Sequence, residues 1–321
     1  MKFKALCAAA TLAAAVLAAP VQAQTLRWAA QNDILTLDPH SQNHATTNAI
    51  LQHAYEGLVR YSAKYEVEPS LATKWTYVSP TQVRFELRRN VKFHDGTPLT
   101  ADDVVFSYGR IKQPQGTMGI YVTGVTDVKK VDNHTVDLTL SGPNPILLRN
   151  LVNFFIMSKA WAEKNKTTNT QDYKNKEENF ASRNAMGTGP YKITGWTPEQ
   201  RITMTINNDW WDKHTSNVKE VVYTPIKSDP TRVAALLSGD VDMLTDLPTQ
   251  DVGRLRADPK LKILDGPEVR TIYLAPDMGS PELKHSNVKG KNPLADKRVR
   301  QALSLAIDRA AIQRSTMRGL S

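Results

Sequence analysis

The sequence contains almost no cysteine and, after its N-terminal region, no long hydrophobic run. Cys7 is the only cysteine among the 321 residues, so a disulfide framework, a CxxC metal site and a thiolate catalyst are excluded from the rest of the chain. No later segment is long and apolar enough to cross a bilayer as a helix. The sequence also lacks a Walker A loop, a GxGxxG fingerprint, a GxSxG elbow and an HExxH helix, so the common nucleotide-binding and hydrolase signatures are missing.

The N-terminus has the pattern of a Sec-type signal peptide. Lys2 and Lys4 precede the apolar run 5–19, and the letters VQA fit the small-x-small rule, so we expect cleavage after Ala23. Cys7 lies inside the apolar run and not at the cleavage point, which predicts a periplasmic protein without a lipid anchor. Removal of the two lysines lowers the net charge from +9 to +7. The remaining basic residues are scattered without a nucleic-acid motif, so they indicate a solvated surface and no nucleic-acid partner.

The most informative stretch is residues 91–110, VKFHDGTPLTADDVVFSYGR. Its first three residues continue an alternating pattern and predict the end of a strand. The following HDGTP is turn chemistry, since glycine supplies positive φ and proline interrupts a ladder. Thr100 is a good N-cap for a helix whose first turn is acidic. His94 and Asp95 resemble an acid–base pair, but their place in this pattern indicates turn residues.

The rest of the chain predicts a mixture of strands and helices. Clean alternation indicates strands at 201–207 and 218–226, and a further strand is expected at 270–275. The polar tract 164–184 is typical of an exposed connection. Helical spacing of apolar residues predicts one amphipathic helix over 294–314.

The string 91–110 closely resembles the hallmark of one family, the large periplasmic solute-binding proteins of peptide-type ABC importers, family 5. Other motifs extend this resemblance across the mature chain in the family's order. They are LDPH at 37–40, YEGLVRY at 55–61, EPSLATKW at 68–75, GTGPYKI at 187–193, NNDWWD at 207–212, DPTRVAALLSGDVDM at 229–243 and PLADKRVRQALSLAIDR at 293–309.

The resemblance implies an α/β fold of the two-lobe, class II (cluster C) periplasmic-binding-protein type, with a mostly-β subdomain inserted in the first lobe. The expected divisions are a signal peptide at 1–23, lobe I at 24–55 and 184–268, the inserted subdomain at 56–183, and the start of lobe II at 269–321. Members of the family continue well past this length, and a segment as short as 269–321 cannot bury an independent core. We therefore expect the second lobe to be largely absent, in a fragment of a longer product or in a truncated remnant without tight ligand binding.

The resemblance further implies a non-enzymatic, monomeric binding component that captures a small solute between its lobes and delivers it to the ABC permease subunits of the inner membrane. A short peptide is the expected ligand, although nickel chelates, opines, glutathione and haem are bound within the family. Asn43, His44 and Ala45 match cleft positions, where main chain could pair with an extended peptide. The alternative is that they cap the helix that follows. Tyr121 is expected either to pack on a ligand side chain or to be an ordinary surface tyrosine.

No catalytic residue, cofactor or metal site is predicted. His40 and His44 are four residues apart, but they lie on a loop and do not form a zinc motif. Ser286 and Lys289 match the SxxK pattern of penicillin-recognising enzymes, so a secreted serine hydrolase is the alternative function. That pattern sits in a glycine- and proline-rich loop, and no SDN or KTG accompanies it.

Three tryptophans and two aspartates could also be assigned to ligand sites. Trp196, Trp210 and Trp211 could line a pocket, but aromatic residues between strands are more typical of a core. Asp240 and Asp242 follow a helix stop and begin a strand, which indicates a turn in preference to a calcium site.

Overall fold

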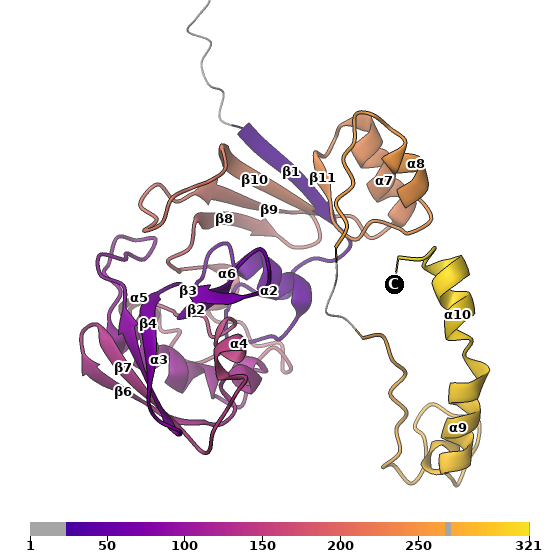
Figure 1. Cartoon of the computed structure of the whole chain (residues 1–321), viewed down its shortest axis with the longest axis horizontal. Helices are drawn as coiled ribbons and strands as arrows, with labels where there is room; N and C mark the ends of the chain where they lie inside the picture. Colours follow the sequence, from indigo (N-terminus) through magenta and orange to yellow (C-terminus); the bar gives the residue numbers. More distant parts are fainter. Residues whose placement is uncertain (1–23, 267–270, 321) are drawn as a thin grey trace, which may run out of the picture. The chain divides into compact units, whose positions relative to one another are not determined.

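The computed structural model describes residues 24–266 and 271–320, which form two compact units that part between Thr245 and Asp246 (Figure 1). The predicted signal peptide 1–23 and the start of the predicted crossing, 269–270, lie outside the described residues. The lobe boundaries expected from the resemblance stay a prediction. Within the described ranges, no helix has the length and apolar character needed to cross a bilayer.

The first unit contains a five-stranded mixed sheet. Its strand order is β11 (Met243–Leu244), β1 (Gln24–Ala30), β10 (Val218–Pro225), β9 (Arg201–Ile206) and β8 (Tyr191–Thr197). Strand β1 is parallel to both of its neighbours, β11 and β10, whereas the pairs β10–β9 and β9–β8 are antiparallel. Helix α7 (Asp229–Ser238) connects β10 to β11; Pro230 stands in its first turn and Gly239, at φ +80°, ends it.

The same unit contains a four-stranded antiparallel sheet and a short two-stranded one. The order of the larger sheet is β4 (Ala72–Ser79), β5 (Gln82–Leu87), β7 (Thr135–Leu140) and β6 (Val125–Asp132), and the small sheet pairs β2 (Val59–Tyr61) with β3 (Val67–Pro69). The outer strands β4, β6 and β8 each contain register shifts. One continuous cluster of buried side chains extends from Ala30 and Tyr223 of the five-stranded sheet to Phe85 and Leu138 of the four-stranded sheet.

The same unit has short helical segments between its strands. They are α2 (Ala45–Leu51), α3 (Ala101–Ile111), the 3₁₀ helix η1 (Met118–Val122), α4 (Leu147–Leu151), α5 (Lys159–Lys164) and α6 (Phe180–Arg183). Thr100 caps α3 as predicted, in a capping box in which its backbone N–H donates to Asp103 at 2.8 Å.

The predicted strand end at 91–93 is wrong, because β5 stops at Leu87. The chain instead folds back on itself, where Phe93 N–H donates to the Thr97 carbonyl at 2.8 Å and Gly96 adopts φ +88°. Val91 and Phe93 are buried as anchors of this loop. Their alternation therefore reflects loop packing and not a sheet ladder.

Asp38 and Arg110 form an ion pair in the interior of the first unit. Both side chains are fully buried, and the guanidinium meets the carboxylate in two contacts of 2.6 and 2.7 Å. Arg110 also donates to the carbonyls of Thr167 and Asn169, at 3.2 and 2.9 Å, and the Gln171 N–H donates to Asp38 at 2.9 Å. Burial alone would raise the pKa of Asp38, but the charge and hydrogen bonds of Arg110 hold it below its usual value.

The expectation that 164–184 is an exposed connection is wrong in part. Thr167, Thr170 and Gln171 are buried, because the tract supplies the backbone groups that surround Arg110. The tract thereby gives the buried ion pair the several hydrogen-bonding partners that it needs.

His40 completes this cluster. It is fully buried, with its Nε2 2.8 Å from the Phe155 carbonyl and its Nδ1 3.2 Å from Arg110 Nη1. Burial, together with the positive charge of Arg110, lowers the pKa of His40 to about 4. The neutral ring can donate from Nε2 and accept from Arg110 at Nδ1, so both contacts are satisfied.

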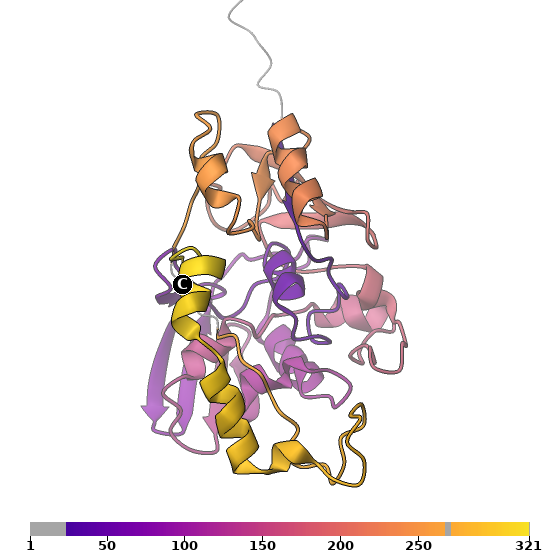
Figure 2. The same ribbon diagram turned by 90° about the vertical axis from the view of Figure 1, so that its right-hand side faces the viewer.

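The second unit contains α8 (Val252–Arg256), the 3₁₀ helix η2 (Pro293–Ala295), α9 (Lys297–Ala306), α10 (Arg309–Ala311) and the π-helical turn η3 (Ile312–Thr316). The single helix predicted for 294–314 is therefore broken, as the yellow segment of Figure 2 shows. Asp308 causes the break by accepting from the Ala311 N–H at 2.8 Å and starting a new helix. The strand predicted at 270–275 is absent over its described residues, where Ile272 is 85% exposed.

We expect Arg110→Met to lower the free energy of unfolding of the first unit by about 3–5 kcal/mol, because it leaves the Asp38 carboxylate buried without its partner. Urea unfolding followed by tryptophan fluorescence measures this, since all six tryptophans precede Thr245. The matched control is Arg27→Met, which removes a pair with Asp242 in which the two side chains are 45% and 38% exposed. The control should cost much less, because an exposed ion pair adds little to stability, and equal losses in the two variants would contradict the prediction.

The stability of the first unit should fall as the pH drops from about 6.5 to about 4. His40 protonates near 6.5 in the unfolded chain but only near 4 in the folded one. The unfolded state therefore binds the extra proton in this window, and the loss levels off below it. In His40→Gln the slope of unfolding free energy against pH should decrease by about one proton, or ~1.4 kcal/mol per pH unit. Unfolding curves at stepped pH check this, and an unchanged slope would rule it out.

Candidate functional site

The loop before α2 and the first residue of that helix contain three of the four predicted site residues, Asn43, His44 and Ala45. His44 is the N-cap of α2, with extended backbone and an Nδ1 that accepts from the Thr47 N–H at 3.4 Å and lies 3.0 Å from its hydroxyl. Burial lowers the pKa of His44, which suits an acceptor role. Asn43 and Ala45 expose their side chains on either side of it. His44 is therefore the residue that caps α2, whereas Asn43 and Ala45 are exposed to solvent.

Tyr121 reaches this loop from η1. Its hydroxyl donates to Asn43 Oδ1 at 3.0 Å, and Asn48 Nδ2 donates to the same oxygen at 3.2 Å. The Asn43 N–H donates to Thr117 Oγ1 at 2.7 Å, which ties the loop to the start of the same 3₁₀ helix. Burial raises the pKa of Tyr121, so its hydroxyl stays protonated and keeps its donor role at neutral pH. Asn43 and Tyr121, far apart in sequence, therefore form one polar cluster, which we call the Asn43–Tyr121 cluster.

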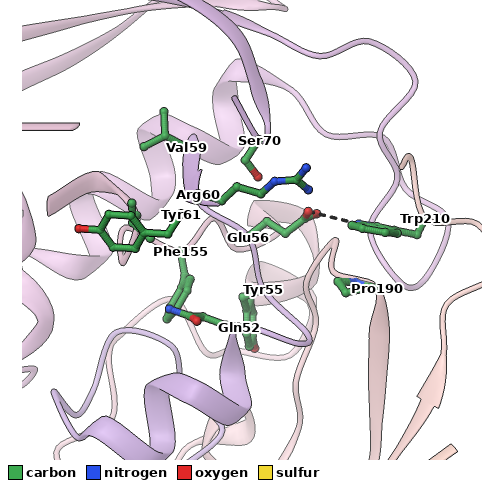
Figure 3. Close-up of a pocket in the computed structure, with 12 residues that line it drawn as sticks. Gln52, Tyr55, Glu56, Val59, Arg60, Tyr61, Ser70, Phe155, Pro190 and Trp210 are labelled. Atoms are coloured by element: carbon green, nitrogen blue, oxygen red, sulfur yellow. Dashed lines mark hydrogen bonds between the residues drawn. The ribbon is translucent and has the colours of Figure 1, made fainter. Parts of the chain in front are cut away.

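A separate cavity of about 270 Å³ is lined in part by the chain that directly follows α2 (Figure 3). Its lining comes from several segments of the first unit. The lining residues are Gln52, Tyr55, Glu56, Gly57, Val59, Arg60, Tyr61, Ser70, Val152, Phe155, Pro190 and Trp210. None of the four predicted site residues belongs to this lining.

Glu56 is the charged centre of this cavity. Its carboxylate accepts from the indole N–H groups of Trp210 at 3.2 Å and Trp211 at 2.9 Å, and from the Thr188 hydroxyl at 2.8 Å. Trp211 also lies 3.1 Å from the second oxygen. Burial raises the pKa of Glu56, and these hydrogen bonds oppose the rise.

Close packing of the GTGPYKI motif orients the Thr188 side chain toward the Glu56 carboxyl group. A Cβ on Gly187 would lie 2.0 Å from the Ala54 carbonyl oxygen, so only glycine fits there. The neighbouring Gly189 N–H donates to that same oxygen at 2.9 Å. The motif therefore holds residues 187–189 against the chain that contains Glu56.

The tryptophans predicted as core residues are half-buried hydrogen-bond donors. Trp210 lines the cavity, and Arg88 lies 3.9 Å from the Trp211 ring centre in a cation–π contact. Trp196 donates to Asp33 at 3.2 Å and lines a second, wider cavity of about 570 Å³. Sequence reasoning missed Glu56 and Ser70; the available signal was an acidic residue inside the otherwise apolar YEGLV run.

The metal and hydrolase alternatives gain no support from the geometry. In the described ranges 24–266 and 271–320, no group of three or more histidine, cysteine or acidic side chains is arranged to hold a metal ion. Ser286 Oγ accepts from the Val288 N–H at 3.0 Å, and Lys289 lies 3.9 Å from Glu282. Neither residue of the SxxK pattern is on a helix.

The remaining acidic and histidine candidates are structural. Asp242 pairs with Arg27 at 2.6 Å, and Asp240 accepts from the Ser238 hydroxyl at 2.8 Å. His94 lies 3.1 Å from the Gly189 carbonyl, and Asp95 accepts from the Thr97 N–H at 3.0 Å within the predicted turn.

The family model for bacterial extracellular solute-binding proteins, family 5 (middle region), matches residues 66–321. This match covers most of the chain, and the chain belongs to that family.

Individual relatives agree with this assignment. The chain is 29% identical to the periplasmic oligopeptide-binding protein OppA of Salmonella typhimurium, over 96% of this chain and 58% of that protein. It is 28% identical to the dipeptide-binding protein of Escherichia coli, over 96% and 59% of the two chains. The solved structure of the Escherichia coli murein tripeptide-binding protein MppA matches with a TM-score of 0.77 and 25% identity, over 92% and 58%. The chain therefore spans less than two thirds of each relative, and the expected α/β fold of the periplasmic-binding-protein type is confirmed.

We expect Glu56→Gln to lower the free energy of unfolding of the first unit by about 2–3 kcal/mol, because an amide offers one acceptor oxygen to donors that now share two. Urea unfolding monitored by tryptophan fluorescence measures the loss. Glu66→Gln, at an exposed position, is the matched control and should stay within about 0.5 kcal/mol of the parent. A Glu56→Gln protein as stable as that control would show that the buried carboxylate does not organise the cavity.

Proposed function

We propose that this chain belongs to the extracytoplasmic substrate-binding component of an ABC importer and helps to capture a short peptide for delivery to the membrane permease. Membership of family 5 supports the solute-binding role, and the three relatives described above are named for oligopeptides, dipeptides and a murein tripeptide. The role requires no bond-making chemistry of the protein itself. Lobe closure on the ligand would shift an open–closed equilibrium, and the permease would read the closed form.

The observation that carries the peptide assignment is the Asn43–Tyr121 cluster. Two donors occupy Asn43 Oδ1, so the amide of this exposed side chain presents its N–H groups outward. An N–H group of this kind suits the carbonyl of a peptide unit. Ala45 beside it is exposed and small, so an extended backbone can approach the loop closely.

The two hydrogen bonds to Asn43 also fix its orientation in advance. A side chain that is already ordered loses little rotamer freedom when a ligand binds, which favours affinity. The half-buried ring of Tyr121 gives the same cluster an apolar surface next to its polar group. We therefore assign Asn43, Ala45 and Tyr121 to ligand contact and His44 to support through its cap.

Equilibrium dialysis of the protein against a mixture of defined di-, tri- and tetrapeptides, read by mass spectrometry, tests this assignment. We expect selective retention of peptides, and about three- to tenfold weaker binding in Tyr121→Phe, which loses one hydrogen bond but keeps its ring. Asn43→Ala should weaken binding by at least as much. Tyr77→Phe, which alters an exposed tyrosine on β4, is the matched control and should bind as the parent does.

Two results would contradict the proposal in different ways. Retention of glutathione or a nickel–histidine chelate in place of peptides would overturn the ligand class and leave the solute-binding role. Peptide binding that is identical in the parent, Tyr121→Phe and Asn43→Ala would exclude the Asn43–Tyr121 cluster as the contact surface.

A further inference from the structure

The cavity beside Glu56 contains a polar group that the protein does not satisfy. Ser70, between β3 and β4, is 1% exposed, and its hydroxyl has no hydrogen-bond partner among the described residues. Its backbone is held firmly, since its N–H donates to the Leu58 carbonyl at 3.3 Å and its own carbonyl accepts from Arg88 Nε at 3.2 Å. A buried hydroxyl without a partner is unfavourable. Ser70 is one of the residues that line the cavity, and it lies beside Arg60 (Figure 3).

The charges around the cavity favour a cation. The hydrogen bonds to Glu56 all come from neutral donors, and together they occupy both oxygens of its carboxyl group. Arg60 is held by Glu68 at 2.7 Å and Asp212 at 3.0 Å, so two acidic groups already neutralise it. Arg88 is the second guanidinium of this cluster. The cluster therefore contains three carboxyl groups, those of Glu56, Glu68 and Asp212, and two guanidinium groups. An anionic ligand would add to the excess negative charge.

The other walls of the cavity are apolar and rich in aromatic rings. They are formed by Tyr55, Val59, Tyr61, Val152, Phe155, Pro190 and Trp210. Aromatic faces attract organic cations, most strongly where water is excluded. The volume of about 270 Å³ exceeds that of an apolar protein cavity of about 150 Å³ that accepts benzene. A single ring or a short alkyl chain with one polar head therefore fits.

We propose that this cavity is a binding site for a small primary ammonium ion that carries one apolar group, with its N–H donating to Ser70 Oγ and its charge facing Glu56. The apolar group would pack against Val152 and Phe155. This site is independent of the Asn43–Tyr121 cluster and of the peptide assignment. It is a second small-molecule site in the first unit.

Titration calorimetry of the protein with three probes of equal size tests the proposal. They are benzylammonium, benzyl alcohol and benzoate, which share a ring but differ in charge. We expect saturable binding of benzylammonium that is about tenfold or more tighter than that of benzyl alcohol, and no binding of benzoate, because a charged donor gains more from the site. Equal affinity for the ammonium and the alcohol, or any preference for benzoate, would overturn the proposal.

Ser70→Ala tests the named contact. The variant should bind benzylammonium about tenfold more weakly, while its melting temperature without probe should not fall, because the substitution removes an unsatisfied group. Ser141→Ala, at an exposed serine outside the cavity, is the matched control and should bind as the parent does. A Ser70→Ala protein that binds benzylammonium as tightly as the parent would rule the site out. No peptide is present in these titrations, so their failure would leave the solute-binding assignment untouched.

Discussion

The buried ion pair between Asp38 and Arg110 is the constraint on which much of the first unit depends. It holds the loop before α2 against α3, and the chain that leaves α3 then packs closely on that loop. A Cβ on Gly116 would lie 2.3 Å from the His40 carbonyl oxygen, and the Thr117 N–H donates to the Ser41 carbonyl at 2.8 Å. Both contacts bring η1 to the loop and so place Tyr121 beside Asn43. The candidate ligand surface is in this sense assembled by a charge pair that is itself fully buried. Because the pair is fully desolvated, it persists only while its full set of hydrogen bonds is made.

Local chemistry was sufficient to predict the elements whose ends depend on nearby residues. The Thr100 cap with Asp103, and Pro230 and Gly239 at the two ends of α7, are short-range devices, and the structure contains each of them. The role of Arg110 could not be predicted in this way. An arginine in the last turn of a helix is ordinarily expected to face water or the helix dipole, whereas its partner here is far away in the sequence. The prediction of a single helix over 294–314 failed for the opposite reason, because the local cap at Asp308 outweighed a regular apolar periodicity.

The two candidate sites could also be predicted from the sequence only in part, because they depend on contacts between distant segments. The resemblance pointed to Asn43 but not to Tyr121, and their mutual hydrogen bond depends on tertiary packing that no motif encodes. The cavity around Glu56 draws its polar groups from segments that are remote from each other, and Ser70 has no distinguishing pattern in the sequence. Only the glutamate within an apolar run carried a signal, because a charge in such surroundings must find partners.

The irregular outer strands of the sheets affect how readily the folded protein can aggregate. At one edge of the five-stranded sheet stands β11 with two residues, and at the other stands β8, whose register shifts near Gly195. Strands β4 and β6 each shift register twice, and β6 exposes Lys129 and Lys130. Straight, unpaired edges recruit other chains into intermolecular sheets, whereas bulges, lysines and very short strands prevent this. These sheets are therefore protected against edge-to-edge aggregation at high local concentration.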